Sequence, residues 1–97
     1  MTITLIASFN IKEGKMNQAL DLLREIVPKV RETEAGCLAY IAHTVTGAKN
    51  KNTIVFYEKY KDKEAMNVHS ANFPKNFEKV FPLLDGKMDL KTCVEII

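Results

Sequence analysis

The hydrophobic residues of this chain change their spacing several times, and these changes restrict the fold more than any other feature of the sequence. Residues 2–11 alternate between apolar and polar positions, which is typical of a strand with one buried face. From Met16 to about Thr33 the apolar residues recur at helical spacing. Alternation returns in residues 37–46, 53–60 and 88–97, which predicts three further strands.

The stretch from Thr53 to Phe81 adds a second helical region. After its strand, Asp62 offers a side-chain oxygen to cap a short helix that ends near residues 70–72. Pro74 then suits the first turn of another helix, where its missing N–H costs no hydrogen bond. Apolar residues form a stripe along this region: Phe73, Phe77, Val80, Phe81 and Leu84. We expect the strand and the two helices to converge on a space lined by aromatic residues, which the imidazole of His69 can enter.

Glycine and proline residues separate or interrupt these elements. Gly36 suits a left-handed end to the long helix, and Asp85-Gly86 interrupts the pattern before the last strand. Pro28 lies inside the long helix and predicts a local kink. The resulting order, β-α-β-β-α(α)-β, predicts one α+β domain over residues 1–97 with a ferredoxin-like antiparallel sheet. Its helices cover one face, and we expect a second copy of the chain to cover the other in a homodimer.

Size and charge limit the partners of this domain. With 97 residues and a formal net charge of +2, the chain is nearly neutral and too short for two independent cores. It contains no basic block with interleaved aromatics and no apolar run of membrane-spanning length, so we expect neither a nucleic acid nor a membrane as partner. The N-terminus lacks a signal-peptide pattern, which favours the cytoplasm. There, Cys37 and Cys93 are expected to be free thiols.

Two motifs, in this order, resemble those of the antibiotic biosynthesis monooxygenase (ABM) family. Residues 34–40, E-A-G-C-L-A-Y, are similar to the family's E-P-G-C-x-x-Y after the long helix, with alanine in place of proline. Residues 56–65, F-Y-E-K-Y-K-D-K-E-A, followed by His69, are similar to its strand-E-x-W/Y-x-D-x-x-A-x-x-x-H. The order of strands and helices also agrees over the whole chain. The resemblance implies a dimeric α+β barrel.

The resemblance also implies a class of chemistry. Relatives include oxygenases that oxidise quinols or polyketide phenols with O2 and need no cofactor, haem-degrading enzymes, and an isomerase of a phosphorylated signalling sugar. Our first interpretation is a cofactor-independent monooxygenase of a quinol or related aromatic. The alternatives are an isomerase of a small carbonyl compound, a haem-binding relative and a non-enzymatic ligand-binding dimer. The second histidine of many members is missing here, because residues 70–74 read S-A-N-F-P; Asn72 is the residue that could occupy nearby space.

His69 and Glu58 are the candidate catalytic residues. An imidazole titrates near neutral pH, so His69 can act as a base or hydrogen-bond donor towards a phenol. The alternative is a helix-end histidine that bonds to backbone or faces water. Glu58 is costly to bury without a partner, and it can either orient His69 or form an ordinary salt bridge or backbone hydrogen bond. We expect His43 to be structural or to lie at the dimer interface. The spacing of histidine and cysteine fits no metal site, and no cofactor is expected.

The candidate substrate-binding residues are aromatic or polar. Tyr57 and Tyr40 can orient a phenolic ligand through their hydroxyl groups, or they can be ordinary strand aromatics. The other candidates are Phe9, Phe56, Phe73, Phe77 and Asn72. The phenylalanines are either core residues or the walls of an apolar ligand pocket. The expected small-molecule partners are an aromatic or carbonyl substrate and O2.

Overall fold

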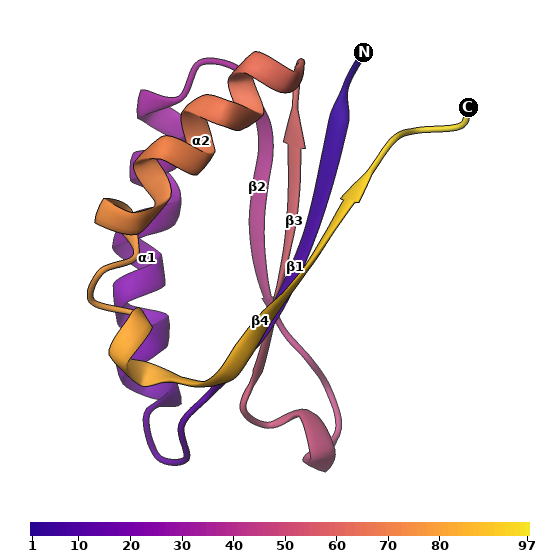
Figure 1. Ribbon diagram of the computed structural model, residues 1–97. Helices are drawn as coiled ribbons and strands as arrows, with labels where there is room; N and C mark the ends of the chain where they lie inside the picture. The colour runs from indigo at the N-terminus through magenta and orange to yellow at the C-terminus, as the bar shows by residue number, and fades with distance from the viewer.

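A four-stranded antiparallel sheet forms one of the two layers of the protein, as described by a computed structural model of residues 1–97 (Figure 1). The strands are β1 (Ile3–Ile11), β2 (Cys37–Thr44), β3 (Thr53–Tyr60) and β4 (Leu84–Cys93). Their order across the sheet is β2-β3-β1-β4, and each neighbouring pair is antiparallel. With two helices on one face, this is the ferredoxin-like α+β fold that the sequence predicts.

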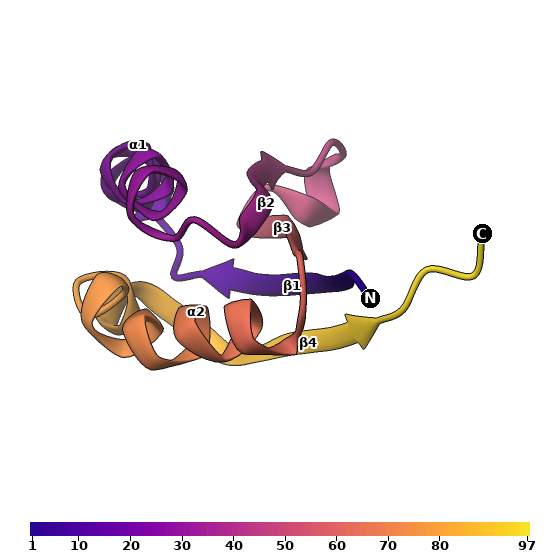
Figure 2. The same cartoon turned by 90° about the horizontal axis from the view of Figure 1, so that it is seen from above.

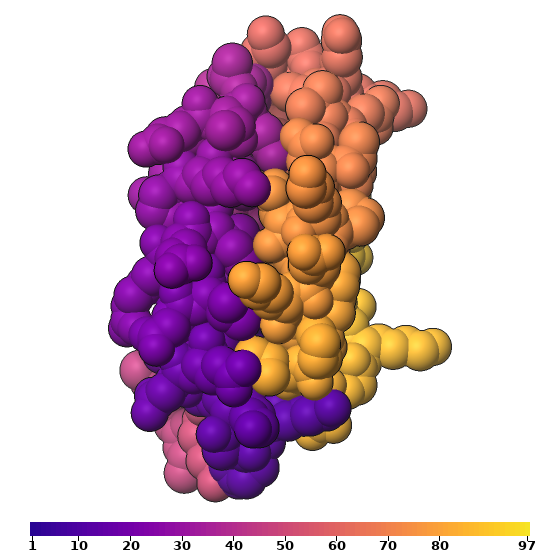
Figure 3. All heavy atoms as spheres, turned by 90° about the vertical axis from the view of Figure 1, so that its left-hand side faces the viewer, coloured from indigo at the N-terminus to yellow at the C-terminus, as the bar shows by residue number.

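The helices α1 (Met16–Thr33) and α2 (Lys63–Asn76) cover the same face of the sheet (Figure 2). Seen from that side, the two helices lie next to each other and hide most of the strands (Figure 3). The main core fills the space between helices and sheet, and its aromatic members are Phe9, Tyr40, Phe56 and Phe77. Neither helix combines the length and the apolar character that a bilayer span requires.

The opposite face of the sheet is not covered by any element of this chain (Figure 2). Pairing across the strands aligns three apolar side chains there, because Tyr57 of β3 lies opposite both Ile6 of β1 and Ile41 of β2. Each of the three is about 40% exposed. The residues on either side of Tyr57 in β3, Phe56 and Glu58, are buried on the helical face, as the alternation of a strand requires.

Helix α2 is longer than the sequence pattern predicts. The predicted break at residues 70–72 does not occur, and α2 runs through Pro74 to Asn76. Pro74 lies in the last turn, where it removes a single backbone bond, and the N–H of Phe77 still donates to the carbonyl of Phe73 at 2.9 Å. A short 3-10 turn, Phe81–Leu83, stands in place of the predicted second helix.

Gly36 has a different role from the predicted one. Its backbone is not left-handed, so it does not end α1 by that mechanism. A Cβ atom at this position would lie 2.4 Å from the Cβ of Ala65 in the first turn of α2, far inside van der Waals contact. The N–H of Lys61 also donates to the Gly36 carbonyl at 2.9 Å. Gly36 therefore permits the start of α2 to approach the connection between α1 and β2.

Irregular pairing explains two further differences from the predicted strands. Cys37 pairs with Tyr60 but Ala39 pairs with Lys59, so Leu38 is an extra residue and Cys37 joins the helical face rather than the face of Ala39 and Ile41. Strand β4 begins at Leu84 rather than at residue 88, and Gly86 lies at a register shift in its pairing with β1. The strand ends at Cys93 rather than at residue 97, because no later residue pairs with β1.

Candidate functional site

His69 is brought into the interior by the local structure at the start of α2. The side chain of Asp62 accepts a hydrogen bond from the N–H of Ala65 at 2.8 Å, which is the N-cap predicted from the sequence. Ala65 and His69, one helical turn apart, are the buried residues of α2. His69 is 5% exposed and points at the sheet rather than at water.

The imidazole of His69 lies between two buried carboxylates. Its Nδ1 is 2.9 Å from Oε1 of Glu34, which follows the end of α1, and its Nε2 is 3.4 Å from Oε1 of Glu58 on β3. Glu34 and Glu58 are 3% and 5% exposed. Because Nδ1 faces a carboxylate at hydrogen-bond distance, it carries a proton and donates it to Glu34. The contact between Nε2 and Glu58 is longer, and it is an ion pair only when the ring carries both protons.

Two tyrosines enclose this cluster. The hydroxyl of Tyr60 donates to Oε1 of Glu58 at 2.7 Å. The rings of Tyr40 and Tyr60 each lie 5.2 Å from the His69 ring, measured between centroids. Burial raises the pKa of both tyrosine hydroxyls, and the charge of Glu58 raises it further, so both remain protonated donors.

Glu58 is the carboxyl group of this cluster whose pKa is raised. Burial raises the pKa of its carboxyl group, the hydrogen bond from Tyr60 and the charge of His69 oppose the increase, and the charge of Glu34 adds to it. No lysine or arginine forms an ion pair with either carboxylate. Burial and the neighbouring charge of Glu34 therefore make the carboxyl group of Glu58 a better proton acceptor than an exposed glutamate.

A small apolar hollow of about 130 Å³ opens beside this cluster. Glu58 and His69 form its polar end, and the rest of its wall comes from Leu5, Ala7, Phe73, Met88, Leu90 and Ser70. We call this space the His69 hollow. A cavity with apolar walls and a few convergent polar groups of altered proton affinity is the usual form of a small-molecule site.

The other predicted substrate-binding residues are distributed unevenly around this hollow. Phe73 lines it, and Tyr40 contacts the His69 ring from within the core. The remaining phenylalanines, Phe9, Phe56 and Phe77, are core residues at 1–3% exposure and do not line the hollow. Tyr57 lies on the uncovered face of the sheet, away from His69. Asn72 is exposed and does not line the hollow either.

Glu34 is the residue of this buried cluster that the sequence analysis did not single out. It was visible only as the first residue of the E-A-G-C motif, while its contact with His69 joins positions 35 apart in the chain. That contact depends on how closely α2 approaches the end of α1, which Gly36 makes possible. Oε2 of Glu34 is the one buried side-chain polar atom that makes no hydrogen bond in the protein.

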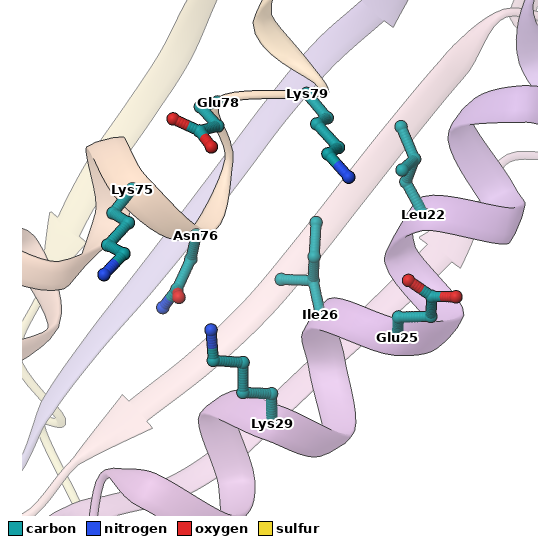
Figure 4. Close-up of a pocket in the computed structure, with 8 residues that line it drawn as sticks. All are labelled: Leu22, Glu25, Ile26, Lys29, Lys75, Asn76, Glu78 and Lys79. Atoms are coloured by element: carbon teal, nitrogen blue, oxygen red, sulfur yellow. The ribbon is translucent and has the colours of Figure 1, made fainter.

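Two of the larger hollows have a different character. A groove of about 240 Å³ between α1 and the end of α2 carries the charged side chains Glu25, Lys29, Lys75, Glu78 and Lys79 over Leu22 and Ile26 (Figure 4). A second groove, of about 620 Å³, lies between α1 and β2 and contains His43, Arg24 and Arg31. No group of three or more histidine, cysteine or acidic side chains is placed to hold a metal ion. Neither groove contains a buried ionisable cluster comparable to that around His69.

The fold and the His69 hollow define a small ferredoxin-like α+β domain with a buried ionisable cluster beside an apolar hollow. Residues 2–73 match the profile of the family described as antibiotic biosynthesis monooxygenase, ABM. The chain therefore belongs to the ABM family. No protein in the curated set matched the sequence.

Solved structures agree with this membership. A crystal structure of an antibiotic biosynthesis monooxygenase is 26% identical to this chain, with a TM-score of 0.84 over 98% of this chain and 99% of the other. A protein from Shewanella oneidensis is 30% identical, with a TM-score of 0.79 over 95% of this chain and 88% of that protein. A Mycobacterium tuberculosis protein shares the fold at 19% identity, with a TM-score of 0.83 over 100% and 97% of the two chains.

Proposed function

We propose that this protein is a cofactor-independent monooxygenase that oxidises a quinol or a related small aromatic compound with O2. The observation that carries the proposal is the position of His69, buried between two carboxylates at the polar end of an apolar hollow. A reduced phenol donates electrons to O2 far more readily after it loses its proton. The protein then needs to supply a base, a place for the ring and protection from water. The family membership supports the same class of reaction.

In the proposed reaction the pair formed by Glu58 and His69 exchanges protons with the substrate. It first takes the phenolic proton, and the phenolate transfers one electron to O2. The resulting radicals combine by forming a C–O bond at the neighbouring ring carbon, and the pair returns its proton to the peroxide. The O–O bond then breaks as that carbon loses its hydrogen, so that water leaves and a carbonyl forms. A quinol and O2 thus give a hydroxyquinone and water.

The size of the hollow restricts the substrate to a narrow class. An engineered cavity of about 150 Å³ in another protein binds benzene, so the roughly 130 Å³ here has room for one ring. We therefore propose a single-ring quinol or phenol, with any larger substituent directed out past the exposed Leu90. Because a porphyrin is much larger than this space, we do not propose haem as the ligand.

The test is O2 consumption by the purified, metal-stripped protein with a panel of single-ring quinols, using isotopically heavy O2 to follow incorporation into the product. His69→Gln is expected to lower the rate about a hundredfold or more, as loss of a general base does. His43→Gln is the matched control and is expected to keep the rate. Equal rates in the two variants, or consumption of O2 with no label in the product, would contradict the proposal.

An isomerase of a small carbonyl compound is the second candidate. The pair formed by Glu58 and His69 could remove a proton from one carbon of the substrate and return it to another. Such a reaction proceeds without O2. Turnover that is equal under air and under nitrogen, and that is lost in His69→Gln, would favour the isomerase over the oxygenase.

We further propose that a second copy of the chain covers the open face of the sheet. The exposed apolar row of Ile6, Ile41 and Tyr57 supports this, because a row of this kind on a sheet face is costly to leave in water. Sedimentation should give the mass of a dimer, and Tyr57→Lys should give a monomer. A monomeric wild-type protein would contradict the proposal.

The free thiols Cys37 and Cys93 agree with the cytoplasmic location that we propose.

A further inference from the structure

We infer that Glu34 passes protons between His69 and solvent through a second opening, on the side of the cluster away from the His69 hollow. Glu34 would then be a positioning residue that acts through His69, because it does not line the hollow where the substrate is proposed to bind. The inference deepens the proposed function: it describes how the substrate's proton leaves the protein when the ring blocks the His69 hollow.

The second opening is a surface hollow of about 270 Å³ at the junction of α1, β2 and α2. Its wall is formed by residues 33–36, which include Glu34, and by Lys61, Asp62, Glu64 and Val68 with Ala65. We call it the Glu34 hollow. It shares no wall residue with the His69 hollow. Glu34 borders one hollow and His69 borders the other, and the hydrogen bond between them joins residues of two separate openings.

The unpartnered oxygen of Glu34 supports transfer of the proton from His69 towards the Glu34 hollow. Oε1 holds Nδ1 of His69 at 2.9 Å, while Oε2 is buried and makes no hydrogen bond in the protein. An unpartnered buried carboxylate oxygen is costly, so a proton, an ion or a water molecule is expected to bind there. Glu34 also borders the Glu34 hollow, so we place the release of the proton to water on that side.

The imidazole completes the path because its two nitrogens face the two carboxylates. A proton received at Nε2 from Glu58 can be matched by release of the Nδ1 proton to Glu34, without movement of the ring. The other ionisable groups packed around the cluster do not compete with Glu34 and His69 for this proton. Tyr40, Tyr60 and Cys37 all have a pKa raised first by burial, that of Cys37 to about 11, so they keep their protons near neutral pH. Lys61, Asp62 and Glu64 belong to the wall of the Glu34 hollow.

The experiment measures how fast the Nδ1 proton of His69 exchanges with water, by NMR of protein labelled with isotope in its histidines. It uses the ligand-free protein, so it does not depend on any substrate. Glu34→Gln is expected to slow the exchange about a hundredfold, because an amide accepts the hydrogen bond but cannot carry the proton. Glu64→Gln is the matched control, since it removes an exposed carboxylate from the same hollow, and it should leave the rate unchanged. A folded Glu34→Gln protein that exchanges at the wild-type rate would overturn the inference.

A second pair of variants tests the route if Glu34→Gln does not fold. Val68→Trp places a large ring over the Glu34 hollow, and Leu90→Trp places one over the His69 hollow, both from exposed positions. The first is expected to slow exchange and the second to leave it unchanged. The reverse result would show that protons enter through the His69 hollow and would overturn the inference. Exchange that depends on Glu34 in a protein with no O2 consumption would instead retain the route and reject the proposed function.

Discussion

The chain contains two histidines in opposite surroundings. His69 is buried, with a carboxylate at each ring nitrogen, beside a hollow large enough for one aromatic ring. His43 is exposed near the end of the edge strand β2, where its Nδ1 contacts the carbonyl oxygen of Val55 at 3.0 Å. The groove beside His43 is nearly five times larger than the His69 hollow, but its charged side chains are arginines. The comparison teaches that burial and paired carboxylates, rather than the size of the neighbouring cavity, distinguish the surroundings of the two imidazoles.

The largest expected difference between the two histidines is in stability. Removing His69 leaves Glu34 and Glu58 buried with no partner on the ring side. Breaking a buried charged pair costs about 3–5 kcal/mol. His69→Ala should therefore lower the free energy of unfolding by about that amount at neutral pH, and by less in acid, where the carboxylates take up protons. His43→Ala, which removes a hydrogen bond at an exposed site, should cost at most about 1 kcal/mol. Urea unfolding of both variants measures this, and equal losses would show that the cluster has no special energetic role.

The next effect concerns the packing that holds His69 against Glu34. Gly36→Ala forces a methyl group into the Cβ of Ala65, and overpacking of this kind costs about 1–3 kcal/mol. For a domain of this size the Tm should fall by about 4–8 °C for each kcal/mol.

The double variant Gly36→Ala/Ala65→Gly provides the control, since it moves the methyl group from one side of the contact to the other. The double variant should be more stable than the sum of the two single losses predicts. Strict additivity would mean that the close approach of Gly36 and Ala65 does not limit the position of α2.

A smaller effect should appear in the pH dependence of stability. Burial raises the pKa of Glu58 in the folded protein above its usual value of 4.5, so the folded protein binds this proton more tightly than the unfolded chain does. The Glu58 contribution therefore favours folding in acid and is lost as pH rises from about 4.5 through the raised pKa. Glu58→Gln should flatten the curve of unfolding free energy against pH in that window. A curve with the same slope in the variant would show that another group is responsible.

The smallest effect is expected at an exposed ion pair. Lys51 and Glu13 lie 2.8 Å apart with both side chains mostly in water, and the pairing lowers the pKa of Glu13. Exposed pairs of this kind contribute little to folding. Lys51→Gln should therefore leave the Tm within experimental error. A clear loss would indicate that the loop carrying Lys51 is more important to the fold than its exposure suggests.

Much of the fold could be predicted from the sequence because local pattern and tertiary structure agree. The alternation of β1 and β3 and the spacing of α1 each place their apolar residues in the observed core. Alternation along β3 places Glu58 on the same face as the buried Phe56, and the predicted Asp62 cap begins the helix that buries His69.

The remaining features depend on contacts between distant parts of the chain. No local signal shows that Glu34 meets His69, or that Gly36 is required by Ala65, because both contacts form only when α2 packs on the end of α1. The prediction that α2 ends before Pro74 was wrong because a proline in the last turn costs only one backbone bond. The bulge at Leu38 likewise arises from pairing between β2 and β3 and has no signature in either strand alone.

The measurement that tests the central claim most directly is the ionisation of a single-ring nitrophenol bound in the His69 hollow, since its absorbance changes when it loses its proton. We predict that the bound fraction is more ionised than the free compound at the same pH, that His69→Gln removes this excess, and that His43→Gln retains it. A nitrophenol that binds without any gain in ionisation, or a gain that survives in His69→Gln, would contradict the account that Glu58 and His69 take the proton of a phenolic ligand.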